Sequence, residues 1–160
     1  MTKQETYDYL NSIGIDYEVT EHTAVFNMEE LDAVELPYPD CDAKNLFVRD
    51  DKKRNYYLIT VKGDKRVDLK AFQQTFGTRR LTFASADDLM AVMGLIPGSV
   101  TPLGLLCDEE RKVIFYLDKA FMGGLAGVHP NDNTATVWLK TEDLVKIIQD
   151  HGNRVNIAEL

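Results

Sequence analysis

The segment Gly-Leu-Ile-Pro-Gly-Ser-Val-Thr-Pro-Leu-Gly, residues 94–104, holds more residues with special backbone properties than an ordinary connection needs. Glycine permits a positive φ and close approach of a ligand, while proline fixes φ and removes a donor. The small residues Gly98, Ser99 and Thr101 leave backbone N–H groups uncovered, and such groups can hold a carbonyl or phosphate oxygen. The segment therefore predicts a rigid loop of defined shape, although a tight turn into a strand at Leu103 fits it too.

Helices and strands are predicted on the N-terminal side of this loop without a regular alternation. Capping residues predict three helices: one from the Thr2/Glu5 capping box to about Ile13, one from cap Asp68 to Phe76 and one from cap Ser85 to Met93. A fourth helix is predicted at 27–34. Periodicity predicts strands at 17–20 and 81–83, and a pair of strands at 45–49 and 55–61 around a turn at 51–54.

The C-terminal side predicts a strand pair at 103–107 and 112–117, a strand at 134–139, a helix capped by Thr141 that ends near Gln149, and a last short strand at 155–157. Several strand pairs are hairpins, and no strict strand–helix–strand alternation is present. We therefore expect an α+β fold with a mixed, mostly antiparallel sheet. The length of 160 residues predicts one domain over residues 1–160.

Composition argues against several classes of protein. The net charge of −8 disfavours broad electrostatic binding of nucleic acid. No apolar run is long enough to span a membrane, and the N-terminus lacks the features of a signal peptide. Cys41 and Cys107 stand far apart and outside any Cys-x-x-Cys motif. We therefore expect a cytoplasmic protein with reduced thiols that binds neither DNA nor a membrane.

Charge is distributed unevenly along the chain. Residues 4–43 hold eleven acidic residues and no Lys or Arg, whereas residues 44–80 hold eleven basic and four acidic residues. A basic middle segment in an acidic protein can contact a short anionic ligand. Solvated strand edges and turns explain the same pattern, since the basic run at 52–54 is typical of a hairpin tip.

Two further residues can carry chemistry. His129 lies in a second glycine-rich, irregular segment, residues 123–134, just before a predicted strand. A histidine fixed there by Pro130 suits a polar ligand, although a surface histidine without a function fits equally. Lys44 begins a predicted strand and is either an edge charge or a point charge for a phosphate. The histidines lack metal-ligand spacing, and neither Ser99 nor a cysteine stands in a nucleophile motif.

Several short segments stand in a recognisable order: HTAVF (22–26), KNLFVRD (44–50), YLIT (57–60), LTFAS (81–85), PGSVTPLG (97–104), HPN (129–131) and NTATV (133–137). Together they resemble the YbaK and prolyl-tRNA-synthetase-associated editing domain family over about residues 5–155. Within it, the chain is most similar to the freestanding ProX-type proteins that deacylate alanyl-tRNA(Pro). Asn27 departs from the threonine of many relatives.

The resemblance implies a compact domain with a mixed, barrel-like sheet and flanking helices. It also implies an aminoacyl-tRNA hydrolase whose pocket is lined by the Gly98–Pro102 loop, with the ribose hydroxyl of the tRNA orienting the attacking water. The implied catalytic residues are Lys44, His129 and Gly98. The implied substrate-binding residues flank them and are Ser99, Val100, Thr101, Pro102, Gly127 and His22.

The expected partner is the aminoacylated 3′ end of tRNA(Pro), with prolyl-tRNA synthetase as a second candidate. Neither a metal nor another cofactor is expected. Cysteinyl-tRNA(Pro) remains an alternative substrate, because Lys44 is common to both branches of the family. A non-catalytic module that binds aminoacyl-tRNA or a free amino acid is an alternative of another class.

Overall fold

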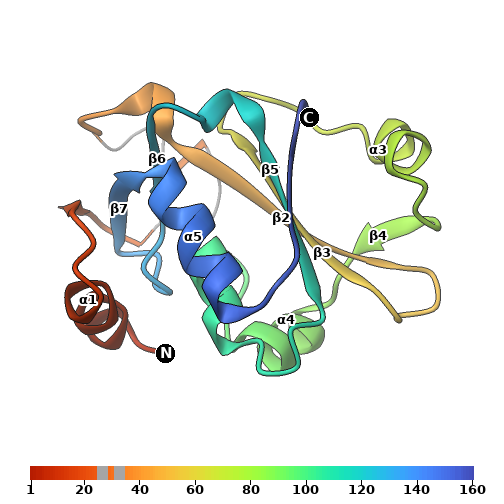
Figure 1. Ribbon diagram of the computed structural model, residues 1–160, viewed down its shortest axis with the longest axis horizontal. Helices are drawn as coiled ribbons and strands as arrows, with labels where there is room; N and C mark the ends of the chain where they lie inside the picture. Colours follow the sequence, from red (N-terminus) through yellow and green to blue (C-terminus); the bar gives the residue numbers. More distant parts are fainter. Residues whose placement is uncertain (25–28, 31–34) are drawn as a thin grey trace.

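Two β-sheets with helices packed around them make up the protein (Figure 1). The structure is a computed structural model and describes residues 1–24, 29–30 and 35–160. The smaller sheet is antiparallel throughout, whereas the larger one combines two antiparallel and two parallel pairs of strands. The predicted α+β class with a mixed, mostly antiparallel arrangement is confirmed.

The larger sheet has the strand order β4-β2-β3-β5-β8. Its strands are β2 (Ala43–Asp50), β3 (Tyr56–Lys62), β4 (Leu81–Phe83), β5 (Val113–Asp118) and β8 (Val155–Ala158). Strands β2 and β3 form the predicted hairpin, and β4 pairs with the end of β2. Strand β5 lies parallel to both β3 and β8. The hairpin strands are therefore central, while β4 and β8 are the edges.

The smaller sheet has the order β1-β7-β6 and is antiparallel throughout. Its strands are β1 (Tyr17–Glu21), β6 (Leu125–Val128) and β7 (Ala135–Lys140). A single parallel bridge between Asp42 and Gly127 joins the two sheets. In the described part of the chain the strands form no closed barrel, so the barrel-like expectation is corrected to two sheets that meet at this bridge.

The described helices are α1 (Lys3–Ser12), α3 (Leu69–Phe76), α4 (Ala86–Met93) and α5 (Thr141–His151), with short 3-10 turns at Pro39–Cys41, Pro102–Cys107 and Lys119–Phe121. The predicted caps of the first three are confirmed, since Thr2, Asp68 and Ser85 each accept a hydrogen bond from the first turn. The predicted helix at 27–34 lies largely on residues outside the described part.

Three local predictions were wrong. The predicted strand at 103–107 is the 3-10 helix η2, because Pro102 favours a helix start and Thr101 Oγ1 accepts a hydrogen bond from the Leu103 N–H. Strand β5 therefore has no hairpin partner before it. Thr141 is not a cap, since its hydroxyl donates to the Phe121 carbonyl. The glycine-rich segment at 123–134 contains β6, which the irregular-loop prediction missed.

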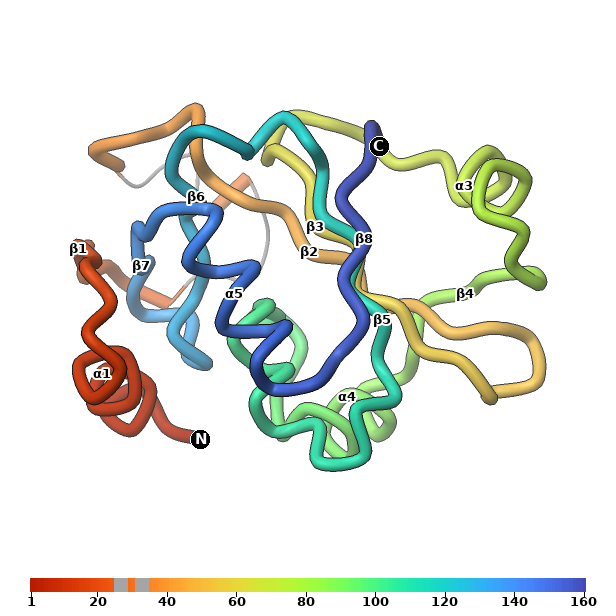
Figure 2. The backbone as a smooth tube through the Cα atoms, in the orientation of Figure 1, coloured from red at the N-terminus to blue at the C-terminus, as the bar shows by residue number. Residues whose placement is uncertain are grey.

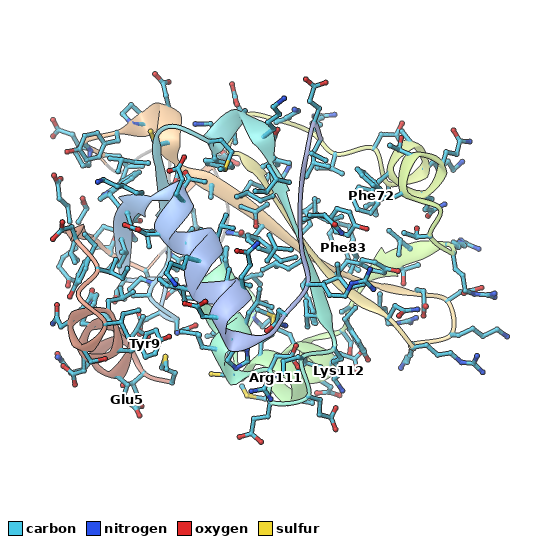
Figure 3. All side chains as sticks on the ribbon, in the orientation of Figure 1. Glu5, Tyr9, Phe72, Phe83, Arg111 and Lys112 are labelled. Carbon is cyan, nitrogen blue, oxygen red and sulfur yellow. The ribbon has the colours of Figure 1, made fainter. Side chains whose placement is uncertain are left out.

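Apolar side chains fill both faces of the larger sheet. The main core includes Phe47, Leu58 and Phe115 and continues to the smaller sheet. Helix α5 packs against η2, β6, β7 and β8 and fills the space between the sheets (Figure 2). The second core lies on the opposite face, where Phe72 of α3 packs on Tyr116 (Figure 3). Alternation along β2 thus decides which core each residue meets.

Candidate active site

The loop between α4 and η2 has the defined shape that its glycines and prolines predict. Gly94 ends α4 in the left-handed conformation, and Gly98 has a φ of 93°. Both the backbone N–H and the hydroxyl of Ser99 donate to the Ile96 carbonyl, at 3.1 and 2.9 Å. Ser99 is buried, so its hydroxyl stabilises the turn and is not presented as a nucleophile.

Two hydrogen bonds fix this loop to its neighbours. The Asn45 Nδ2 donates to the Val100 carbonyl at 3.3 Å, and the Asn45 Oδ1 accepts from the Thr60 hydroxyl at 2.6 Å. On the other side, the fully buried Thr101 donates its hydroxyl to the His129 carbonyl at 2.6 Å. The loop is therefore held against β2 and against the residue that precedes Pro130.

The loop keeps unused main-chain donors. Within the described residues, the N–H groups of Gly98, Val100 and Thr101 donate to no other group. A backbone N–H that has no internal partner requires water or a ligand oxygen. Thr101 is fully buried, so a ligand cannot reach its N–H. The N–H groups of Gly98 and Val100 lie on one short rigid loop, and they can serve as a preorganised binding site for an oxygen that carries negative charge.

His129 follows β6 and presents one free ring nitrogen. Its Nδ1 lies 2.9 Å from the Ala135 carbonyl, which can only accept, so Nδ1 carries the proton. Its Nε2 has no hydrogen-bond partner among the described residues. Burial lowers the pKa of His129, and the hydrogen bond to Ala135 offsets only part of this effect. A neutral His129 can therefore accept a hydrogen bond or a proton at Nε2.

His22 lies beside His129. The two ring centroids are 6.2 Å apart in an edge-on arrangement, and the His22 N–H donates to the Thr134 carbonyl, which extends the β1–β7 ladder. Its ring nitrogens are both engaged, Nδ1 at 2.9 Å from the Thr23 carbonyl and Nε2 at 3.0 Å from the Thr136 hydroxyl. His22 therefore shapes the surroundings of His129 and has no spare nitrogen of its own.

Lys44 is placed differently from the other predicted residues. On β2 it lies opposite Val61, a member of the second core, whereas Asn45 projects toward the loop. Its Nζ donates to the Lys65 carbonyl at 3.4 Å. It forms no ion pair with any described residue, nor a hydrogen bond to the loop or to either histidine. The ammonium group is therefore available to an anion, and its predicted role stays a prediction.

The remaining predicted residues lie in the same region. Pro102 is buried at the start of η2, directly after Thr101. Gly127 lies in β6 opposite Trp138, where an added Cβ would overlap the indole ring. Close packing accounts for the glycine at this position. The structure thus brings together the Gly98–Pro102 loop, His129 and His22, with Gly127 in the strand that leads to His129.

Sequence reasoning missed Asn45 and Thr60. They face each other across β2 and β3, where their hydrogen bond and the contact to Val100 position the loop. The signal in the sequence was two polar residues within apolar strands, because buried polar groups in strands need partners.

Among the described residues, no cluster of three or more His, Cys, Asp or Glu side chains has an arrangement that could hold a metal ion. Of the helices in the same part of the chain, none is both long and apolar enough to cross a membrane.

Comparisons with known proteins identify the family of this chain. The model of the aminoacyl-tRNA editing domain matches residues 22–147. The prolyl-tRNA editing protein ProX of Acetoanaerobium sticklandii is 40% identical over 159 residues, which cover 99% of this chain and 97% of that protein. The prolyl-tRNA synthetase associated domain-containing protein 1 of Mus musculus is 35% identical over 156 residues, covering 94% and 92%.

A solved structure described as a candidate trans-editing enzyme for prolyl tRNA synthetase has the same fold. Its TM-score is 0.70 at 20% identity, with 98% of this chain and 96% of that chain covered. The resemblance inferred from the sequence motifs is thus confirmed, and with it the expectation of an aminoacyl-tRNA hydrolase as the class of enzyme. The chain belongs to the aminoacyl-tRNA editing domain family.

Proposed function

We propose that this protein is a trans-editing deacylase that hydrolyses mischarged alanyl-tRNA(Pro). The observation that carries the proposal is the loop at 98–102, whose main-chain donors are unused within the described residues and which Thr101 ties to a neutral His129. Identity of 40% to a prolyl-tRNA editing protein over nearly the full length of both chains supports the class of substrate.

The reaction adds water to the ester carbonyl and then breaks the bond to the ribose oxygen, which leaves as a hydroxyl group. The carbonyl oxygen gains negative charge on the way. The N–H groups of Gly98 and Val100 are suited to hold that oxygen, and one such donor is typically worth about 100-fold or more in rate. An ester is already activated, so the protein needs no nucleophile of its own.

His129 and Lys44 have complementary roles in this proposal. The free Nε2 of neutral His129 accepts a hydrogen bond from the ribose hydroxyl or from the attacking water. The vicinal ribose hydroxyl then orients the water, so that the substrate assists its own hydrolysis. Lys44, which lacks an ion pair among the described residues, holds the terminal phosphate as a point charge.

Selection by size explains why such an enzyme is needed. An apolar pocket built for proline rejects the smaller alanine by only about 1–3 kcal/mol, so a synthetase alone makes errors. A second site that admits alanine and excludes proline removes them. A rigid loop can enforce this limit, because its shape is fixed by Gly98 and by the bonds of Val100 and Thr101.

The test is a deacylation panel with alanyl-, cysteinyl- and prolyl-tRNA(Pro), together with alanyl-tRNA(Ala). We expect fast release of alanine from tRNA(Pro) only. Preferential cleavage of cysteinyl-tRNA(Pro) would show that cysteine, and not alanine, is the amino acid removed. Binding of aminoacyl-tRNA without cleavage would show that the protein is a binding module and not an enzyme.

Two matched variants connect the activity to the site. His129→Gln removes the free Nε2 and is expected to lower the rate strongly. His151→Gln changes a histidine at the end of α5, where Nδ1 bonds to Asn153, and is expected to leave the rate unchanged. Equal rates for both variants would remove His129 from the mechanism.

A further inference from the structure

The tip of the β2–β3 hairpin is a rigid basic projection remote from the loop at 98–102. It lies near β4 at one end of the molecule (Figure 1). Five basic residues gather there, and we call them the basic tip: Lys52, Lys53, Arg54, Arg79 and Arg80. All five are exposed.

Two carboxylates give the basic tip its shape. Asp50 is fully buried, and it accepts hydrogen bonds from the N–H groups of Lys52 and Arg54 and from the Asn55 amide. Asp51 holds Arg79 through two hydrogen bonds of 2.6 and 3.0 Å, which fasten the α3–β4 connection to the hairpin. The acidic groups thus bind the backbone and one arginine. The side chains of Lys52, Lys53 and Arg54 form no hydrogen bond or ion pair with the described residues.

Protection of a sheet edge does not explain these lysines. Strands β2 and β3 are central in their sheet, and its edges are β4 and β8. Lys53 also has a φ of 53°, a conformation that glycine or asparagine adopts at lower cost. The exposed ammonium group of Lys53 has no partner among the described residues, so its charge is free to meet an anion.

A groove continues the basic surface along α3. It has a volume of about 650 Å³, and Leu69 and Leu81 contribute to its lining together with Lys70 and Arg80. Both cationic residues are exposed. They therefore extend the positive charge of the basic tip along the groove, where it suits the phosphates of an RNA backbone.

We propose that the basic tip, together with Lys70 and Arg80 beside this groove, binds the sugar–phosphate backbone of the tRNA acceptor stem. The proposal rests on the deacylase function above. Asn45 touches the loop at 98–102, and five strand residues separate it from Asp50, which corresponds to about 17 Å. This distance suits the paired stem and not the terminal nucleotide, which occupies the loop.

The acidic part of the chain favours one orientation of a bound RNA. The acidic residues of 4–43 include those of α1 and β1, at the opposite end of the molecule from the hairpin (Figures 1 and 2). A polyanion is repelled there and attracted at the basic tip, so RNA binds in one orientation despite a net charge of −8.

The experiment compares two triple variants with equal loss of charge. The tip variant carries Lys52→Gln, Lys53→Gln and Arg54→Gln. The control variant neutralises exposed residues of the α5 side: Lys140→Gln, Lys146→Gln and Arg154→Gln. Each is assayed on intact alanyl-tRNA(Pro) and on the alanyl ester of adenosine, which lacks a stem, and melting temperatures verify folding.

We expect the tip variant to lose about tenfold or more in kcat/KM on the intact tRNA. The log–log slope of kcat/KM against salt should become shallower by about one for each phosphate that the variant no longer neutralises. On the alanyl ester of adenosine it should stay within about twofold of wild type, as surface changes rarely affect a distant site. The proposal is overturned if both triple variants behave alike on tRNA, or if the tip variant loses activity on both substrates equally.

Direct binding of uncharged tRNA(Pro), measured by fluorescence anisotropy, separates this proposal from the deacylase function. Weaker binding by the tip variant alone supports the docking surface even if wild type cleaves no ester. Equal binding by wild type and the tip variant refutes it even if alanine is released. Binding of an acidic protein in place of RNA at the same residues would likewise contradict it.

Discussion

Replacement of Gly98 by alanine tests whether the loop's backbone shape matters. Gly98 has a φ of 93°, which lies beyond the left-handed region near 60° that other residues occasionally adopt. Holding a non-glycine residue in such a conformation costs about 1–3 kcal/mol. For a domain of this size, that cost lowers the melting temperature by about 3–10 °C.

Gly98→Ala should also slow the reaction. The alanine relieves its strain by rotating the backbone, and the N–H groups of Gly98 and Val100 move with it. The hydrogen bonds from Asn45 and from Thr101 hold the rest of the loop, so the displacement is concentrated at the donors. A misplacement of about 1 Å in a reacting site can cost about 100-fold in rate. We therefore expect kcat on alanyl-tRNA(Pro) to fall between about tenfold and 100-fold.

Gly77→Ala is the matched control. Gly77 ends α3 with a φ of 67°, and a Cβ built there meets nothing within 4 Å. Gly77→Ala places an alanine in the left-handed region away from the loop, with less strain than at Gly98, so stability should fall modestly while deacylation continues at the wild-type rate. Urea unfolding and deacylation are measured on both variants. The reasoning fails if Gly98→Ala keeps wild-type stability, or if it loses stability and, like Gly77→Ala, keeps full activity.

Three further predictions concern single groups. Lys44→Ala should strongly reduce deacylation while stability changes by no more than about 0.5 kcal/mol; a folded variant with the wild-type rate removes Lys44 from the site. Because burial lowers the pKa of His129, the acidic limb of the kcat/KM profile should lie below pH 6.5. Just below pH 6.5, His129 is protonated in the unfolded chain but not in the folded chain, so the free energy of unfolding falls as the pH drops below 6.5 and is unaffected above it. The assignment is contradicted if the free energy of unfolding rises as the pH drops, or if its pH dependence is the same in His129→Gln. Activity should survive chelators, since the described residues contain no cluster that could hold a metal ion, and it should survive thiol-blocking reagents, since Cys41 and Cys107 lie outside the loop. Inactivation by a chelator that added zinc reverses would refute this prediction.

Local signals in the sequence identified most of the helices and the central hairpin. Thr2, Asp68 and Ser85 specify helix starts because their side chains satisfy N–H groups that no helix can satisfy internally. The hairpin was also predictable, since two apolar strands flank a short polar turn at 51–54. These signals act over a few residues, and distant parts of the chain do not alter them.

The failures involve signals that an apolar or glycine-rich pattern does not carry. An apolar run such as 103–107 suits a strand or a buried helical turn, and here Pro102 and the Thr101 hydroxyl start a turn that packs against α5. Strand β6 forms because β7 supplies its hydrogen-bond partners, which a glycine-rich sequence does not reveal. Alternation along β2 predicts which face of the sheet Asn45 lies on, but it does not predict that the loop packs against that face, because the position of the loop is set only on folding.

The site itself is specified mostly by main-chain groups. The carbonyls of Ile96, Val100 and His129 accept the hydrogen bonds that shape and anchor the loop. The carbonyl of Ala135 selects the tautomer of His129. Even the hydroxyl of Ser99, the nearest group to a nucleophile, is used to fold the loop. An ester that water can hydrolyse with little help requires placement more than reactivity, so a domain for this reaction needs a stiff loop and a neutral base in fixed positions. The proposed mechanism is thus consistent with a chain that has no nucleophile motif but a loop whose shape is determined by glycine, proline and threonine.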